Sequence, residues 1–417
     1  MRVGIVAARL GEVDGVSFEA LKWQAVLTGV GHEVVRCAGA LGEARGRLDQ
    51  VIPEMHLGYA PAARVSADAF DPLSNADEVR ATIDQLAGDL LPKLADWVES
   101  TAVDVLIIQN AWAIPMQLPL GVALARLVRD TGIATIGHHH DYWWERERFT
   151  TCVVPEVLRE AFPPNLPGVR HVSINSLAAA DLYARRGLES TTVPNVFDFD
   201  QPLPEGSERD ARRLRAEMGL ADTDLLFVQP TRVVPRKGIE LAIELVARLN
   251  QRLDGARSVL LITSPAGDEG HDYLVELLDL AARLKVDLRY EPERFRPDSA
   301  RHTGPAHSLA DAYIAADVIT YPSLYEGFGN ALVESVYFRK LTVVNRYSVY
   351  EADIRPLGFR FIELLDEVTD EAVDALRQAL ADPVRMRVDS EHNFALAREH
   401  FGYDRLRRDL ASLVSRP

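Results

Sequence analysis

Short apolar runs alternate with longer amphipathic stretches along most of the chain. The apolar runs are four to seven residues long, which suits buried strands, and the stretches between them carry apolar residues at helical spacing. This alternation is typical of parallel sheets, because each crossover between parallel strands needs a connection that packs on the sheet. The expected strands are 2–8, 32–37, 104–110, 133–139 and 169–175 in the first half, and 225–230, 258–264, 286–290, 317–322 and 341–345 in the second.

One segment interrupts the alternation near the middle of the chain. Residues 192–210, TVPNVFDFDQPLPEGSERD, are rich in proline and acidic residues and show no sustained periodicity. Such a segment is typical of a linker. We therefore expect an α/β protein with two doubly wound domains, 1–195 and 196–394, and a cleft at the carboxyl ends of both sheets. Residues 391–414 have a further helical pattern.

Composition and charge narrow the possible partners. The 417 residues carry a formal net charge of −16, which argues against a surface for nucleic acid or anionic lipid. No segment reaches the roughly 18 consecutive apolar residues of a bilayer span, and the N-terminus lacks the apolar run of a signal peptide. The two cysteines, Cys37 and Cys152, fit a reducing compartment. We expect a cytoplasmic protein without stable membrane binding, and the sequence leaves the oligomeric state open.

Three cations crowd the predicted start of a helix in the second half. Arg232, Arg236 and Lys237 precede apolar positions that mark a helix beginning near Gly238. A helix N-terminus prefers acidic side chains, and each exposed cation there costs roughly 0.3–1 kcal/mol. A bound phosphate would remove this conflict. The alternative is solvated surface charge.

The stretch EGFGNALVE, residues 326–334, places two carboxylates around a glycine turn. It follows an expected strand and opens an expected helix, so backbone N–H groups at the helix start favour an anion. Gly327 and Gly329 allow a backbone to approach a ligand closely. Glu334 lies about one turn into the helix, where a surface carboxylate is also favourable. Glu326 precedes the turn and is expected to face the ligand.

These segments together resemble a known family. VPNVFD, TRVVPRKG and DAYIAADVITYPSLYEGFGNALVE are similar to the C-terminal domain of retaining glycosyltransferases of family 4, in the glycosyl transferases group 1. Glu326 and Glu334 match the family's E-x7-E pattern. The resemblance is close over residues 190–350 and looser over the first half. It implies the GT-B fold, with two facing Rossmann-like domains, and a terminal helix at about 395–417 that packs back on the first domain.

The resemblance also implies an activity. A family member moves a hexose from a UDP- or GDP-linked sugar to a hydroxyl of an acceptor, with retention and without a metal or cofactor, and we expect a soluble acceptor here. Arg232 and Lys237 would hold the donor diphosphate, Glu326 would contact the donor sugar, and Glu334 would bind the ribose. The N–H groups of the turn would bind sugar and phosphate, and the residues concerned are Phe328, Gly329, Asn330 and Ala331.

The first half offers weaker candidates. In GEVDGVSF, residues 11–18, the resemblance favours a functional loop at Gly15 and Val16, although a capped helix start also fits. In GHHHDYWWERERF, residues 137–149, the resemblance implies one histidine near the donor hexose. His140 is our choice, with His139 as the alternative. A metal site is disfavoured, because adjacent residues of an extended chain point in alternating directions.

Further residues of the first half, and of the linker, have two interpretations each. Trp143, Trp144 and Arg146 suit an acceptor site or aromatic packing under a loop. Asp198 and Asp200 form a D-x-D, which binds a metal in another glycosyltransferase fold, and we interpret them as linker residues.

Other functions remain possible within the same fold. These are a sugar-nucleotide epimerase, a phosphorylase, and a nucleotide-sugar binding protein without turnover. The sequence does not identify the base, the hexose or the acceptor.

Overall fold

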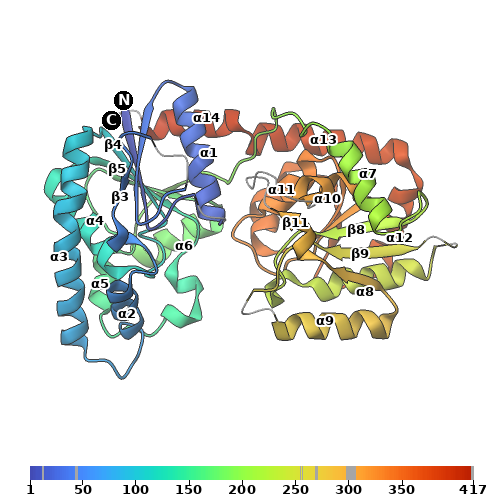
Figure 1. Cartoon of the computed structure of the whole chain (residues 1–417), viewed down its shortest axis with the longest axis horizontal. Coiled ribbons are helices and arrows are strands. Elements are labelled where there is room, and N and C mark those ends of the chain that lie inside the picture. The colour runs from blue at the N-terminus through green and yellow to red at the C-terminus, as the bar shows by residue number, and fades with distance from the viewer. Residues whose placement is uncertain are drawn as a thin grey trace. The chain divides into compact units, whose positions relative to one another are not determined.

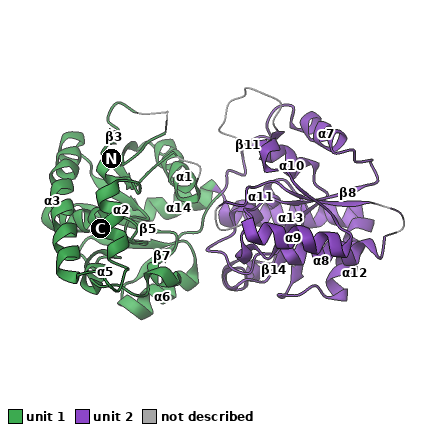
Figure 2. Cartoon of the chain, turned by 60° about the horizontal axis from the view of Figure 1, so that its bottom comes forward, with its two compact units in different colours: residues 1–196, 403–417 green, residues 197–402 purple. Residues whose placement is uncertain are grey.

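The computed structural model describes residues 1–11, 14–42, 46–253, 255, 257–267, 271–296 and 307–414. The chain divides into two compact units (Figure 2). Unit 1 comprises residues 1–196 with 403–417, and unit 2 comprises residues 197–402. Each unit is built on one parallel sheet.

Unit 1 contains a seven-stranded sheet in the order β3-β2-β1-β4-β5-β6-β7. All neighbouring strands in it are parallel. The strands are β1 (Arg2–Ala7), β2 (Glu33–Ala38), β3 (Gln50–Val51), β4 (Val105–Gln109), β5 (Ala134–His139), β6 (Val169–Ser173) and β7 (Ser190–Thr192).

Alternate residues of these strands enter two separate cores. Leu106 and Ile108 pack with α2 to α5, whereas Val105 and Ile107 pack with α1 and α14 on the other face. Burial on both faces explains the continuous apolar runs, and each fully buried aliphatic side chain contributes about 1.5–3 kcal/mol. The helices are α1 (Gly15–Gly29), α2 (Ala60–Asp68), α3 (Ala76–Thr101), α4 (Leu118–Thr131), α5 (Pro155–Ala161), α6 (Ser176–Arg186) and α14 (Tyr403–Val414).

Unit 2 contains a six-stranded parallel sheet in the order β10-β9-β8-β13-β14-β15. Two further short strands, β11 (Phe295–Arg296) and β12 (His307–Ser308), pair with each other. The sheet strands are β8 (Leu225–Gln229), β9 (Ser258–Ile262), β10 (Asp287–Tyr290), β13 (Val318–Tyr321), β14 (Leu341–Asn345) and β15 (Ile362–Leu364).

Helices cover both faces of this second sheet as well (Figure 1). Leu260 and Ile262 pack with α8, α9 and α12, and Val259 and Leu261 pack with α7 and α10. The helices are α7 (Ser207–Glu217), α8 (Ile239–Asn250), α9 (His271–Leu284), α10 (Leu309–Ala315), α11 (Asn330–Tyr337), α12 (Asp370–Ala381) and α13 (Pro383–Phe401).

Short helical turns complete the described structure. The 3-10 turns are Pro53–Met55, Trp143–Glu145, Glu147–Phe149, Pro235–Lys237, Pro292–Arg294 and Arg355–Leu357, and Tyr350–Ile354 forms a π-helical turn. Across the segments that the structure describes, no helix combines the length and the apolar character needed to cross a bilayer.

The predicted α/β class with two doubly wound sheets is confirmed. All ten expected strands are present, and their ends lie within two residues of the predicted positions. Among the described strands, the sequence analysis missed five, β3, β7, β11, β12 and β15. These strands are two or three residues long and lie at sheet edges, so they carry no apolar run that a pattern could reveal.

Candidate active site

A buried ion pair joins the two unit 2 motifs that the sequence singled out. The Nζ of Lys237, at the end of the turn after β8, donates to Oε1 of Glu326, which lies after β13. Arg236 donates to the other carboxylate oxygen at 2.9 Å. Lys237 and Glu326 are each only 7% exposed. The sequence analysis noted all three residues, but it did not foresee that the carboxylate would hold two of the cations.

The charges in this cluster do not cancel. Burial raises the pKa of Glu326, but Lys237 and Arg236 outweigh that effect and hold the pKa below its usual range. Burial lowers the pKa of Lys237, and Glu326 offsets only part of that shift. Arg232 is exposed, and its guanidinium has no hydrogen bond or ion pair within the described part of the chain. The cluster contains three cations and one carboxylate. Its excess positive charge, located just after β8, favours binding of an anion.

Two backbone features hold these turns against each other. The N–H of Leu324 donates to the carbonyl of Arg236 at 2.9 Å. Gly238 has φ +57°, and a Cβ at this position would lie 2.5 Å from the carbonyl oxygen of Pro322. Only glycine fits both the left-handed conformation and the close approach.

The glycine turn before α11 is equally constrained. Gly329 has φ +133°, and a Cβ there would lie 2.4 Å from the hydroxyl of Tyr347. That hydroxyl donates to the carbonyl of Phe328 at 2.6 Å. Helix α11 then starts at Asn330 without a side-chain cap. An uncapped N-terminus carries positive potential and suits an anionic ligand. Ala331 follows Asn330 in the first turn of this helix.

Glu334 lies within α11 and is held by a tyrosine. The hydroxyl of Tyr313 donates to Oε2 of Glu334 at 2.9 Å. Tyr313 is buried and stacks on Phe338, with ring centroids 4.9 Å apart. The position of Tyr313 therefore depends on packing, and no pattern in the sequence predicted its contact with Glu334. Glu326 and Glu334 have different partners.

The three consecutive histidines of unit 1 have different environments. His138 is buried and stacks on Trp23 at 4.1 Å. His139 is buried on the other side of the strand, with its Nε2 3.0 Å from Nδ1 of His171. His140 follows the end of β5 and is partly exposed. Of the two candidates from the sequence, only His140 has surface that a ligand can reach.

His140 is held by the two residues at the end of β4. Its N–H donates to Oδ1 of Asn110 at 2.9 Å, and its Nε2 lies 3.5 Å from Oε1 of Gln109. Burial lowers the pKa of His140 to about 4, although the nearby Asp141 and Asp14 act in the opposite direction. The ring is therefore neutral at pH 7, which suits a hydrogen-bonding role.

The candidate acceptor residues divide between packing and exposure. Trp143 donates from Nε1 to the carbonyl of Phe162 at 3.0 Å and packs against the core. Trp144 is partly exposed and stacks on Tyr142 at 4.6 Å. Arg146 is exposed and donates from Nε to Asp141 at 3.0 Å. Trp143 and Trp144 are both partly exposed and both pack against the core of unit 1, so burial does not separate them, whereas Arg146 is exposed.

The segment at the start of α1 forms a capped helix. Asp14 accepts hydrogen bonds from the N–H and the hydroxyl of Ser17, both at 2.9 Å. Gly15 is exposed with no atom within 4 Å of its would-be Cβ, and Val16 is partly buried. Two residues of the predicted loop, 12 and 13, lie outside the described residues. The cap is present, and Gly15 has open space beside it.

The D-x-D residues have ordinary polar partners. Asp198 accepts the N–H of Asp200 at 3.1 Å, and Asp200 pairs with Arg398 at 2.7 Å. Among the residues that the structure describes, no three His, Cys, Asp or Glu side chains lie close enough together to hold a metal ion.

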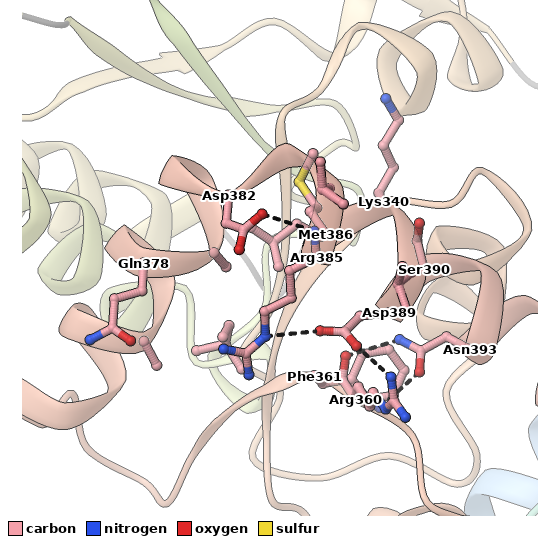
Figure 3. Close-up of a pocket in the computed structure, with 16 residues that line it drawn as sticks. Lys340, Arg360, Phe361, Gln378, Asp382, Arg385, Met386, Asp389, Ser390 and Asn393 are labelled. Carbon is pink, nitrogen blue, oxygen red and sulfur yellow. Dashed lines mark hydrogen bonds and ion pairs between the residues drawn. The ribbon is translucent and has the colours of Figure 1, made fainter.

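A separate cavity of about 620 Å³ lies in unit 2, beside α12, α13 and the strands β14 and β15 (Figure 3). Its charged groups partner each other, since Arg360 pairs with Asp389 at 2.6 Å and Arg385 reaches the same carboxylate at 3.6 Å. Lys340 donates instead to the carbonyls of Ile314 and Ala316. None of the site residues expected from the sequence lines this cavity.

Comparison with known proteins places the chain in a family. The model "Glycosyl transferases group 1" matches residues 210–395. Mannosylglucosylglycerate synthase of Thermotoga maritima is 32% identical over 97% of this chain and 98% of that protein. The chain belongs to the glycosyl transferases group 1 family. It is a glycosyltransferase.

Two further comparisons agree with this family. Mannosylglucosylglycerate synthase of Petrotoga mobilis is 33% identical over 87% of this chain and 86% of that protein. A crystal structure of Anabaena Alr3699/HepE in complex with UDP-glucose matches with a TM-score of 0.62 over 99% of both chains, at 14% identity. This likeness confirms the GT-B fold.

Proposed function

We propose that this glycosyltransferase is a retaining, metal-independent hexosyltransferase of family 4 that uses a nucleoside diphosphate sugar. The observation that carries the proposal is the cluster around Glu326, in which Lys237 and Arg236 share one buried carboxylate and Arg232 lies exposed nearby in the sequence. The excess positive charge suits a diphosphate. A solved GT-B structure holding UDP-glucose supports this donor class.

In this proposal the positive cluster stabilises the departing diphosphate. Lys237 and Arg232 hold the phosphate oxygens, and the uncapped start of α11 adds N–H groups from Phe328 to Ala331. Preorganised charge of this kind lowers the barrier because negative charge grows on the leaving group in the transition state. Glu326 keeps Lys237 in place and accepts from a donor hydroxyl, and Glu334 binds the ribose.

Unit 1 supplies the remaining groups. We assign His140, which is neutral at pH 7, to the donor hexose and Gly15 and Val16 to the phosphates, as the family resemblance implies. Trp143, Trp144 and Arg146 are proposed to contact the acceptor. Since no enzymic nucleophile is evident in the sequence, we infer that the acceptor hydroxyl attacks on the face that the diphosphate leaves. Its oxygen bonds the reacting carbon as the bond from that carbon to the diphosphate breaks, and its proton passes to the leaving diphosphate, which gives retention.

We further propose the substrates. The two relatives that match most of the chain are both named mannosylglucosylglycerate synthase. We infer that this chain transfers a mannosyl group from a nucleoside diphosphate mannose to a hydroxyl of glucosylglycerate. That acceptor carries a carboxylate and no lipid chain, which fits the earlier expectation of a soluble acceptor.

The test is a matrix of donors and acceptors with product analysis. GDP-mannose, UDP-mannose and UDP-glucose are each incubated with glucosylglycerate, glycerate, glucose or inositol 3-phosphate, and products are identified by mass and by the anomeric NMR coupling. The proposal expects a mannosylated glucosylglycerate with the donor's anomeric configuration. An inverted product overturns retention, and transfer only to inositol 3-phosphate overturns the acceptor assignment.

The rival functions give different outcomes in the same assay. An epimerase changes the donor sugar without any acceptor, and a phosphorylase needs inorganic phosphate. A binding protein without turnover releases no nucleoside diphosphate. Release that depends on the acceptor therefore distinguishes the transferase from all three. The cytoplasmic location stays a prediction.

A further inference from the structure

The two residues at the carboxyl end of β4 contact two of the three consecutive histidines at the end of β5 and just after it. Oε1 of Gln109 lies 2.9 Å from Nδ1 of His138 and 3.5 Å from Nε2 of His140. Gln109 and His138 are 2% and 1% exposed, so bulk water does not compete for these contacts. The rings of His138 and His140 are neighbours, with centroids 4.5 Å apart.

Asn110 fixes the backbone beside these rings. It has φ +58°, an uncommon value for a residue other than glycine. In this conformation its N–H donates to the carbonyl of His138 at 2.9 Å, and its Oδ1 accepts the N–H of His140 at 2.9 Å. Its Nδ2 donates to Asp141 at 3.3 Å. Such strain persists where surrounding contacts enforce it, and here the contacts all hold the segment around His140.

The chemistry of an amide oxygen sets the protonation of both rings. In the orientation that the structure shows, Oε1 of Gln109 faces both rings and its Nε2 has no partner in the described part of the chain. A carbonyl oxygen only accepts, so in this orientation the ring nitrogens that face it carry the protons. His138 is then protonated at Nδ1, and its Nε2 carries a lone pair. The Nε2 of His138 is buried and has no partner in the described part of the chain. This agrees with an unprotonated nitrogen, which has no N–H that needs an acceptor. By the same rule His140 carries its proton at Nε2.

We propose that Gln109 is a positioning residue that fixes His140 in the Nε2–H tautomer, so that Nδ1 presents a lone pair to a hydroxyl of the donor sugar. This proposal rests on the proposed function, which places His140 at the donor. Gln109 touches no substrate in this account. It acts through the ring that does, and Asn110 sets the position of that ring.

Charged and polar groups from several elements surround His140. Asp141 adjoins it in the chain, Asp14 and Lys22 face it from α1, and the ring of His138 adjoins it on β5. Gln109 adds a neutral acceptor from β4. The ring is neutral at pH 7 in this setting. Placing a carboxylate at position 109 would stabilise the imidazolium, which has no lone pair at either nitrogen.

The direct test is the histidine tautomer in the full chain without substrate. Long-range ¹H–¹⁵N NMR of histidine-labelled protein distinguishes the two neutral forms, and His140→Gln assigns the signal. The proposal expects the Nε2–H form in the wild type and a mixture in Gln109→Leu. An Nδ1–H form in the wild type, or an unchanged tautomer in folded Gln109→Leu, overturns it. Because no sugar is present, this result is independent of the proposed substrates.

The pH dependence of activity gives a second test, because it would not change if Gln109 had only a structural role. In Gln109→Glu, the ratio of kcat/KM to that of the wild type should fall at least tenfold from pH 8 to pH 5.5, as His140 becomes charged. Gln50→Glu makes the same change at an exposed position of β3 and should give a constant ratio. A constant ratio for Gln109→Glu overturns the proposal. A wild type without transferase activity instead overturns the proposed function.

Discussion

Lys237 and Glu326 lie 89 positions apart in the chain and form a buried ion pair that joins the turn after β8 to the turn before α11. Arg236 shares the carboxylate at 2.9 Å. The three residues therefore do not contribute equally to stability, because Glu326 has two ion-pair partners and Lys237 has one.

Because Glu326 has more ion-pair partners than Lys237, we expect substitutions at these two positions to lower the free energy of unfolding by different amounts. Glu326→Gln leaves the buried ammonium of Lys237 unpaired beside another cation and should lower the free energy of unfolding by about 3–5 kcal/mol. Lys237→Met leaves the carboxylate paired with Arg236 and should cost less. Urea denaturation measures both. Lys93→Met removes an exposed pair with Glu54 and should change stability by less than about 1 kcal/mol. Equal costs for the two buried substitutions would refute the asymmetry.

The glycine turn predicts a second, local effect. Gly329→Ala introduces a Cβ 2.4 Å from the hydroxyl of Tyr347 at φ +133°, so the turn must shift. We expect weaker donor binding and at least a tenfold loss of kcat/KM, since displacement by about 1 Å can cost 10²-fold. Gly88→Ala is the control, because Gly88 lies inside α3 with nothing within 4 Å. It should stabilise the protein by about 0.5–1 kcal/mol. Normal donor affinity in Gly329→Ala would show that the turn does not bind the donor.

The histidines predict how stability depends on pH. Burial lowers the pKa of His171 to about 4, and it holds those of His138 and His139 well below 6.5. Between pH 6.5 and about 4 the unfolded chain therefore binds more protons than the folded one. The free energy of unfolding should fall as pH falls through this window, by up to about 1.4 kcal/mol per pH unit for each histidine.

Urea titrations between pH 7 and 4.5 measure this decline. His171→Gln removes one of the contributing groups and should make the decline shallower than in the wild type. A wild-type stability that is flat across the window would contradict the prediction.

Metal independence is tested by chelation. The proposed leaving-group stabilisation uses Lys237, Arg232 and backbone N–H groups, so neither the histidine run nor Asp198 and Asp200 needs an ion. Transferase activity should be unchanged after treatment with EDTA. Loss of activity that Mg²⁺ or Mn²⁺ restores would overturn this part of the proposal.

The sequence predicted the fold well because burial on both faces leaves continuous apolar runs in the strands. It located the turn at Gly329 through its neighbours and through the following helix. It did not predict β3, β7, β11, β12 or β15, since edge strands of two or three residues need no apolar run. Nor did it distinguish His139 from His140, because which ring enters the core depends on the helices packed on each face.

Partners distant in the chain were the hardest to predict. Tyr313 supports Glu334, and Gln109 supports His140, yet tyrosine and glutamine at strand or helix ends carry no specific signal. The pairing of Arg236 with Glu326 was also missed, although both residues had been singled out. Sequence spacing identified charged groups, and only the folded turns showed which of them meet.

The most direct test of the account is the turnover of Lys237→Ala. Acceptor-dependent release of nucleoside diphosphate is measured at saturating donor and acceptor for the wild type, for Lys237→Ala and for Lys93→Ala. If Lys237 stabilises the leaving diphosphate, its loss should reduce kcat by roughly 10²-fold or more, the range for removing one preorganised donor, while Lys93→Ala stays near the wild type. Near-normal turnover of a folded Lys237→Ala protein would contradict the account.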